Sequence, residues 1–185
     1  MATKRIARGH AAPDLGFTAL VAQWPDAAVA VLQRLDDPDQ IQEWLNGIVS
    51  ADWSQLRSPL SVVRDRRCNP LDAGLFAAAA LRRLGLRPSV LPIRRGDDVW
   101  LAALFRQGSK LGVVGWHPDA RLRFRRVAPA QVAVLAHSLA VDGVVAVMPL
   151  RSYNLAHFDG QDWMTDDSAA GRAAEVVLAA LDRLP

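Results

Sequence analysis

The stretch NPLDAGLFAAAALRRLG, residues 69–85, decides the fold because it predicts a helix that is buried on most of its surface. Asn69 is a favourable N-cap and Pro70 suits the first helical position. Asp72 falls at the third position, where a carboxylate can accept hydrogen bonds from free backbone amides. The alanine run inside the stretch permits close packing, and Gly85 is the expected left-handed stop. We therefore expect this helix at the centre of the protein.

Further helices are expected before this stretch and at the end of the chain. The predicted helical segments are 13–24, 25–37, 37–50, a short turn at 58–66, 129–140 and 166–184. The first three carry a Pro-Asp pair at their start. That pair suits a first turn, because proline has no amide to lose there and the carboxylate faces the positive end of the helix dipole.

Strand-like segments follow the central helix. The predicted strands are 89–95, 98–106, 110–116, 121–127 and 143–150. The turns RGDD and QGSK separate the first three strands. Turns this short join antiparallel neighbours, since a parallel pair needs a long crossover. The sequence therefore predicts an α+β protein, in which a helix packs on an antiparallel sheet.

The composition is that of one folded domain without a linker. Its 185 residues can bury a core, and its 51% hydrophobic and 22% charged residues exclude a disordered chain. The expected parts are a helical N-terminal part over 1–57, a core over 58–164 and a C-terminal helix over 165–185.

The sequence predicts a cytoplasmic protein. A single cysteine cannot form an internal disulfide, so the cysteine content does not indicate an oxidising compartment. The basic N-terminus is followed by Pro13, Asp14 and Gly16 rather than by the apolar run of a secretory signal. No window approaches eighteen uninterrupted apolar residues, so we expect no membrane-spanning helix.

Arginine carries almost all of the positive charge in this chain, whose formal net charge is +3. The arginines cluster within 64–67, 82–87, 94–95 and 121–126. One interpretation is a surface for nucleic acid or another polyanion. The other is a set of solvated faces, offset by acidic runs such as LDDPDQ. No nucleic-acid motif or interleaved aromatic pattern accompanies the arginines, so nucleic acid is not an expected partner.

A helix ending in LRRLGLRP, followed by VWLAALF and KLGVVGW, resembles the transglutaminase-like, papain-related superfamily. The sequence is most similar to an uncharacterised bacterial branch, in which an SPL segment precedes the helix. The resemblance runs from Ser58 to Met164 and takes in LFAAAALRRLG, RLRFRRV and YNLAHFDGQDWM. It implies a transglutaminase-like fold with the buried helix against the sheet.

The resemblance also implies that the catalytic residues have been lost. The family uses a cysteine in the first turn of the helix, a histidine base on a following strand, and an Asp or Asn that orients the histidine. Counted back from Gly85, the cysteine position falls on Pro70; counted back from Phe105, the histidine position falls on Trp100. The third position falls near Pro118. The implied protein is non-catalytic and binds a protein or peptide partner through the cleft or a sheet edge.

A catalytic alternative uses Cys68, the only cysteine, as a nucleophile. His117 would be its base and Asp119 would orient the histidine, giving a cysteine hydrolase or acyltransferase that works through a thioester on a glutamine or peptide carbonyl. Cys68 lies two residues before Pro70, a displacement of about 6–7 Å in extended chain. That distance exceeds hydrogen-bond reach for a base placed to serve the family position.

Two tryptophans are expected where the catalytic residues would have been. Trp100 and Trp116 would either fill the cleft between helix and sheet or line an aromatic groove, and Asp98 or Asp119 could accept the indole N–H of Trp100. Asp97 and Asp98 read as solvated turn acids. The four histidines lack paired spacing and have no cysteine partner, so neither a metal nor a cofactor is expected.

Overall fold

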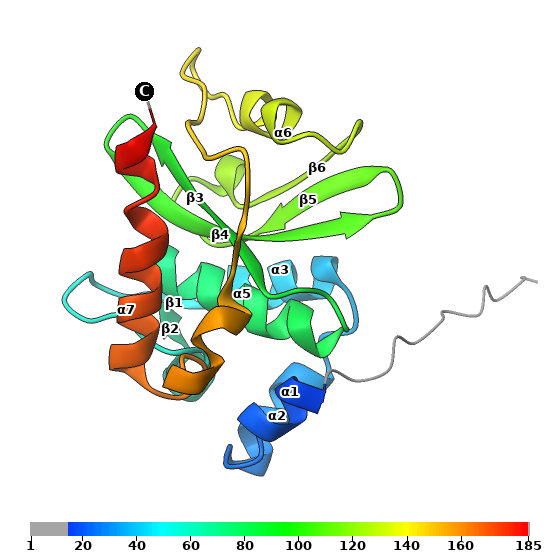
Figure 1. Cartoon of the computed structure of the whole chain (residues 1–185), viewed down its shortest axis with the longest axis vertical. Coiled ribbons are helices and arrows are strands. Elements are labelled where there is room, and N and C mark those ends of the chain that lie inside the picture. The colour runs from blue at the N-terminus through cyan, green and yellow to red at the C-terminus, as the bar shows by residue number, and fades with distance from the viewer. Residues whose placement is uncertain (1–14, 185) are drawn as a thin grey trace, which may run out of the picture.

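The computed structural model describes residues 15–184 and places helices on both sides of a five-stranded antiparallel sheet (Figure 1). The elements are α1 (Leu15–Leu20), α2 (Asp26–Gln33), α3 (Pro38–Asn46), β1 (Val49–Ser50), α4 (Pro59–Asp65), β2 (Arg67–Cys68), α5 (Pro70–Arg83), β3 (Ser89–Arg95), β4 (Asp98–Gln107), β5 (Lys110–Val114), η1 (Ala120–Leu122), β6 (Phe124–Val127), α6 (Val132–Ser138), β7 (Tyr153–Asn154), η2 (Leu155–Gln161), α7 (Asp167–Leu178) and η3 (Leu181–Arg183). The expected start of the first helix at Pro13 lies outside the described residues. None of the described helices is both long and apolar enough to cross a bilayer.

The central helix α5 begins where its capping residues predict. The Asn69 side chain accepts hydrogen bonds from the amides of Leu71 and Asp72 at 2.8 and 2.9 Å. The Asp72 carboxylate accepts the Asn69 amide in return at 3.0 Å, which completes a capping box. Gly74 then lets the helix approach β4 closely, because a Cβ at this position would lie 2.4 Å from the Cβ of Leu101.

The strand order in the sheet is β6-β5-β4-β3-β7, and all neighbours are antiparallel. The two predicted hairpins are confirmed. Gly96 and Gly108 occupy the first central positions of their two-residue turns, and each has a φ of 58°. Glycine adopts this left-handed φ without steric cost, so these turns set the register of β3, β4 and β5.

Both faces of the sheet are covered, which the sequence did not predict. Figure 1 shows α5 and α3 on one side of the sheet and α6 on the other. Side chains alternate along β4, so Leu101, Ala103 and Phe105 join the core with α5. Trp100 and Ala102 join a second core with α6 and the segment that follows it. The predicted packing of a helix on an antiparallel sheet is confirmed.

The predicted strand 143–150 is wrong. This segment forms only isolated bridges, and the fifth strand is β7 instead. Ala146 and Met148 are buried in the second core, whereas Val145 and Val147 are exposed. The alternation that predicted a strand therefore comes from a segment that is buried on one side and meets the edge of β3 at an isolated bridge between Val147 and Arg94.

The outer edge of β3 is left with few free backbone groups. Arg94 exchanges two backbone hydrogen bonds with Val147, at 2.9 and 2.7 Å, so its amide points away from β4. Pro92 lies two residues earlier and faces the same way, but it has no amide to donate. β7 pairs with the beginning of β3. Pairing and proline together therefore shield this edge.

Candidate functional site

A pocket of about 430 Å³ opens at the first turn of α5. Its walls come from the segment after β1, the turn between β3 and β4, and the segment after β5. The lining residues are Ser50, Ala51, Trp53, Pro70, Asp97, Asp98, Val99, Trp116, His117 and Pro118. Pro70 and Pro118, two of the three positions that the resemblance aligned with a catalytic triad, both lie here. The volume is in the range of ordinary small-ligand sites, about 300–1,000 Å³.

Trp53 stands at the mouth of this pocket on the loop that follows β1. The side chain is 59% exposed, and it also borders a second hollow beside α7. The start of the loop is fixed by a hydrogen bond from the Ala51 amide to the Cys68 carbonyl, at 2.9 Å. Among the described residues, no ring, cation or hydrogen-bond partner contacts the Trp53 indole. A large part of an aromatic side chain is thus accessible beside the pocket.

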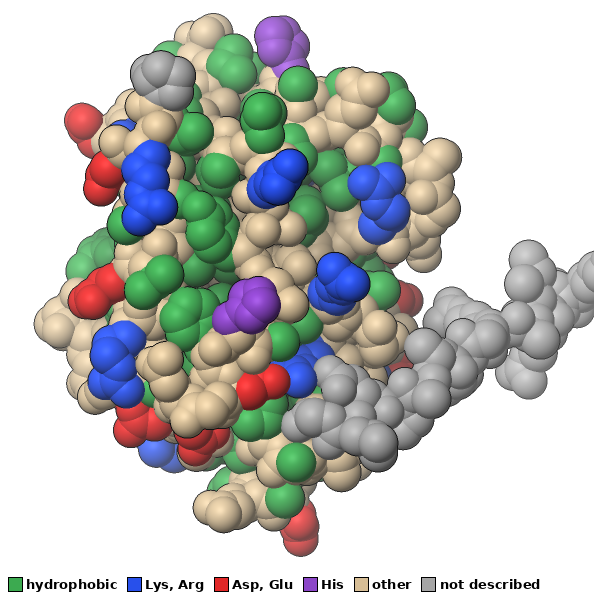
Figure 2. Space-filling model, viewed as in Figure 1, with side chains coloured by type: hydrophobic (Ala, Val, Ile, Leu, Met, Phe, Trp, Pro, Cys, Tyr) green, Lys and Arg blue, Asp and Glu red, His purple; other side chains and the backbone are tan. Residues whose placement is uncertain are grey.

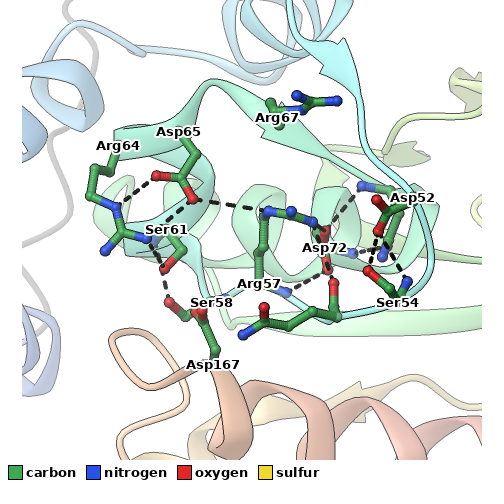
Figure 3. A network of polar contacts seen from close by, with 12 residues as sticks. Asp52, Ser54, Arg57, Ser58, Ser61, Arg64, Asp65, Arg67, Asp72 and Asp167 are labelled. Atoms are coloured by element: carbon green, nitrogen blue, oxygen red, sulfur yellow. Dashed lines mark hydrogen bonds and ion pairs between the residues drawn. The ribbon is translucent and has the colours of Figure 1, made fainter.

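The other end of this loop is held by a buried polar network (Figure 3). The Arg57 amide donates to Asp72 Oδ1 at 2.8 Å, and the Arg57 guanidinium lies 3.8 Å from Oδ2. Ser58 donates its amide to Asp167 Oδ1 at 2.8 Å and its hydroxyl to the Thr165 carbonyl at 2.9 Å. The loop is therefore attached to α5 and to the start of α7, with Trp53 carried between its anchored ends.

Asp72 is structural, although its protonation behaviour is unusual. Burial raises the pKa of this carboxyl to about 6, against the hydrogen bonds from Arg57 and Asn69, which lower the pKa. The side chain is fully buried and does not line the pocket. Its two oxygens accept backbone amides from the loop and from the start of α5. Asp72 therefore joins two segments of the chain and is not directed at a ligand.

Cys68 is sealed inside the core beneath the same turn. Its exposed fraction is 0%, and it belongs to the core cluster that packs around α5. Burial, together with the nearby Asp72 carboxylate, raises the pKa of the Cys68 thiol to about 12. A cysteine nucleophile needs the opposite, a low pKa and access to solvent. Cys68 packs as a small apolar side chain and does not line the pocket.

His117 lines the pocket, but it is not arranged as the base of a triad. Its Nδ1 accepts a hydrogen bond from the Asp119 backbone amide at 3.0 Å, so the neutral ring carries its proton on Nε2. Burial lowers the pKa of His117, which keeps the ring neutral. Asp119 was expected to orient this ring through its carboxylate. The carboxylate instead bonds to Arg121, which lowers the pKa of Asp119 to about 2.

The predicted position of Trp100 in the cleft is wrong. Trp100 is 1% exposed, lies in the second core and does not line the pocket. Because side chains alternate along a strand, Val99 and Leu101 face α5 while Trp100 faces the opposite side. Neither Asp98 nor Asp119 accepts its indole N–H, which is buried without a hydrogen-bond partner in the described structure. Trp100 packs against the other face of His117, with ring centroids 4.9 Å apart.

The two acids of the β3–β4 turn differ in their surroundings, and both line the pocket. Asp98 accepts a hydrogen bond from Arg95 at 3.1 Å, and its Oδ2 lies 3.7 Å from His117 Nε2. Asp97 is exposed and has no hydrogen bond or ion pair within the described chain. The expectation of two equivalent solvated acids therefore holds for Asp97 only, because Asp98 is paired with Arg95.

The arginines of 121–126 are engaged by the protein itself. Their partners are Asp119 for Arg121, the His117 carbonyl for Arg123, the Ser138 carbonyl for Arg125 and Asp39 for Arg126. On the face drawn in Figure 2, basic side chains lie apart from one another, separated by hydrophobic and neutral surface. The face drawn in Figure 2 therefore shows no continuous basic track of the kind that follows a nucleic-acid backbone.

No group of three or more His, Cys, Asp or Glu within the described chain is placed to hold a metal ion. Comparison with known protein families finds no match for this chain, and comparison with curated proteins finds none either.

Sequence reasoning missed two features of this site. Trp53 lies in SADWSQL, a stretch with no strand or helix period, and only the pairing of β1 with β2 brings it to the start of α5. Asp97 belongs to a two-residue turn, where an acid is ordinary. A lone tryptophan between polar residues, Asp52 and Ser54, was the one available signal.

Proposed function

We propose that this protein is a non-catalytic, transglutaminase-like protein that binds a peptide segment of a partner in the pocket at the start of α5. The papain-like assignment is supported by the arrangement of the core. A buried helix is followed by three antiparallel strands, and the middle strand of the sheet packs against that helix through Gly74 and Leu101. The first turn of the helix meets the ends of β4 and β5 at the pocket.

One observation carries the non-catalytic part of the proposal. The only thiol, Cys68, is fully buried with a pKa raised to about 12, while the pocket beside it is open. Where a nucleophile would stand at the first turn, Pro70 has neither a reactive group nor a backbone N–H. The open surface therefore has the means to bind a ligand and lacks the means to attack one.

Thiol reactivity tests this part directly. We expect iodoacetamide to leave Cys68 unmodified in the folded protein at all pH values where the protein stays folded, and to react once denaturant is added. Because the chain has a single cysteine, the denatured sample is its own positive control. Rapid alkylation of the folded protein near neutral pH, titrating below the free-thiol pKa of about 8.5, would contradict the proposal and favour a cysteine enzyme.

Peptide selection tests the binding part. Peptides selected from a displayed library on the wild-type protein should lose most of their affinity for a Trp53→Ala variant and retain it for Cys68→Ala. Leu150→Ala is the matched control, since Leu150 is an apolar side chain at 80% exposure that does not line the pocket. Failure to enrich any peptide, or undiminished binding to Trp53→Ala, counts against the pocket as the binding site.

A further inference from the structure

We infer that the pocket at the start of α5 recognises an arginine side chain in the partner segment. This inference rests on the proposed function and names the chemistry that the pocket selects. A guanidinium would lie between the Trp53 indole and the carboxylate of Asp97.

The charge of the lining favours a cation. Two of the lining residues are carboxylates, Asp97 and Asp98, and none is lysine or arginine. His117, the remaining titratable group in the lining, stays neutral because its Nδ1 accepts a backbone amide and burial lowers its pKa. Arg95 already engages Asp98 at 3.1 Å, which leaves Asp97 without a side-chain partner among the residues that the structure describes. The unsatisfied charge at the pocket is therefore negative and is placed on Asp97.

The aromatic surface favours a flat cation. Trp53 is exposed at the mouth and has no cation from the described residues over its ring, whereas two other tryptophans already hold a guanidinium. Arg66 lies 4.7 Å from the Trp44 ring centroid, and Arg123 lies 5.0 Å from that of Trp116. Indole is the side chain with the most favourable cation–π interaction. Trp53 offers a third position of the same kind.

Arginine fits this combination better than lysine does. The guanidinium is planar, stacks on aromatic faces and can donate two parallel hydrogen bonds to one carboxylate. An ammonium group is compact, strongly hydrated and makes no such paired contact. His117 Nε2, which lies 3.7 Å from Asp98 Oδ2, adds a neutral N–H donor beside this carboxylate in the lining of the pocket.

The test uses blocked Gly-Gly-Arg-Gly-Gly peptide and the same peptide with lysine, citrulline or glutamate in place of arginine. Citrulline keeps the shape of arginine and removes its charge. Binding is followed through the indole N–H resonance of Trp53, which the Trp53→Ala spectrum identifies. We expect the arginine peptide to bind about 10-fold more tightly than citrulline and several-fold more tightly than lysine, with affinity falling as salt is added.

Two variants locate the contact. Asp97→Asn should weaken the arginine peptide by about 3- to 5-fold, because the pair is exposed to solvent. Glu43→Gln removes an equal charge from an exposed position of α3 outside the pocket, and it should change nothing. Asp97 is exposed and has no side-chain hydrogen bond or ion pair within residues 15–184, so this change should leave the fold intact.

Each outcome decides the matter. Equal binding of the citrulline or glutamate peptide overturns the arginine inference and leaves the proposed peptide site standing. The arginine inference is also overturned, and the peptide site is retained, if the selected peptides shift the Trp53 resonance and the arginine peptide leaves it unchanged. If neither selected nor blocked peptides move that resonance, the proposed function fails along with the inference.

Discussion

The two sides of the first turn of α5 share a few residues of sequence and have opposite surroundings. On the inner side, Cys68 and Asp72 are fully buried, and both oxygens of Asp72 are hydrogen-bonded to the backbone. On the outer side, Pro70 faces an open pocket that carries Asp97, which has no partner in the described chain, and the exposed Trp53. The thiol and the buried carboxylate are enclosed in the structure, whereas the exposed indole and the exposed carboxylate border the pocket.

This comparison separates two meanings of an unusual pKa. The raised pKa values of Cys68 and Asp72 have burial as their largest cause. Burial of this kind often marks a catalytic group, yet neither side chain reaches the pocket. A shifted pKa in a side chain that does not reach solvent or the pocket therefore reflects burial and does not identify a catalytic group.

The largest effect is expected where the inner side is packed most tightly. In Gly74→Ala, the new Cβ would lie 2.4 Å from the Leu101 Cβ and 2.5 Å from its carbonyl oxygen, so helix and sheet must separate. We expect a loss of about 3 kcal/mol in the free energy of unfolding, measured by urea denaturation.

Gly171→Ala is the control for this change. It is also a helical glycine, but its nearest contact would be an ordinary 3.7 Å to Leu56. Alanine should stabilise the helix there by up to about 1 kcal/mol. Similar losses at both positions would show that Gly74 is not a point of close approach.

Asp72→Asn weakens the link between the inner side and the pocket loop. An amide has only one acceptor oxygen for the two backbone amides that Asp72 accepts, so we expect a loss of about 2 kcal/mol in stability near neutral pH. Hydrogen exchange should speed up at Arg57 and across the loop that carries Trp53. Unchanged exchange in that loop would contradict its anchoring by Asp72.

The pH dependence of this same variant follows from the direction of the pKa shift. The folded-state pKa of Asp72 is raised from 3.8 to about 6, so its favourable contribution is complete below pH 3.8 and is lost as pH rises through about 6. The asparagine variant lacks this titration. The wild type should therefore be more stable than Asp72→Asn at both pH values. The difference in the free energy of unfolding should be about 1–2 kcal/mol larger at about pH 5 than at about pH 8. A difference that grows with pH would contradict the assigned environment.

Cys68→Ala should have a smaller effect, about 1 kcal/mol, because it removes one buried sulfur from an apolar setting. Cys68→Ser should cost more, since its hydroxyl would be buried among apolar neighbours. Neither change should alter peptide binding. Loss of binding in Cys68→Ala with stability preserved would place the thiol in the site.

Trp53→Ala should have the smallest effect on stability, within about 0.5 kcal/mol, because the side chain is 59% exposed and has no partner in the described structure. Thermal unfolding measures this directly. A loss well above that value would mean that Trp53 supports the fold, and the inner and outer sides would then not be separate.

Local signals in the sequence predicted most of the fold. The capping residues Asn69 and Asp72 and the turn glycines Gly96 and Gly108 each act within a few residues, and each is found where it was expected. The prediction of a strand over 143–150 was wrong, because a period of two indicates burial on one side and does not require a neighbouring strand.

The candidate site could be predicted only in part. Its location at Pro70 came from the spacing to Gly85, but the prediction for β4 did not settle which face of the sheet Trp100 occupies. Trp53 could not be predicted, because the short pairing of β1 with β2 carries no signal in sequence. Asp97 could be assigned to its turn, but the sequence does not show that Arg95 pairs with Asp98 and leaves Asp97 unpaired among the described residues.

The shielded edge of β3 bears on how copies of this protein behave when crowded together. A free strand edge is a template on which another chain can add, which leads to fibres and precipitates. Here Pro92 contributes no amide, Arg94 is already bonded to Val147, and β7 covers the beginning of the strand. Concentrated solutions should therefore resist strand-to-strand polymerisation at this edge, and an extended peptide should not be able to lengthen the sheet there.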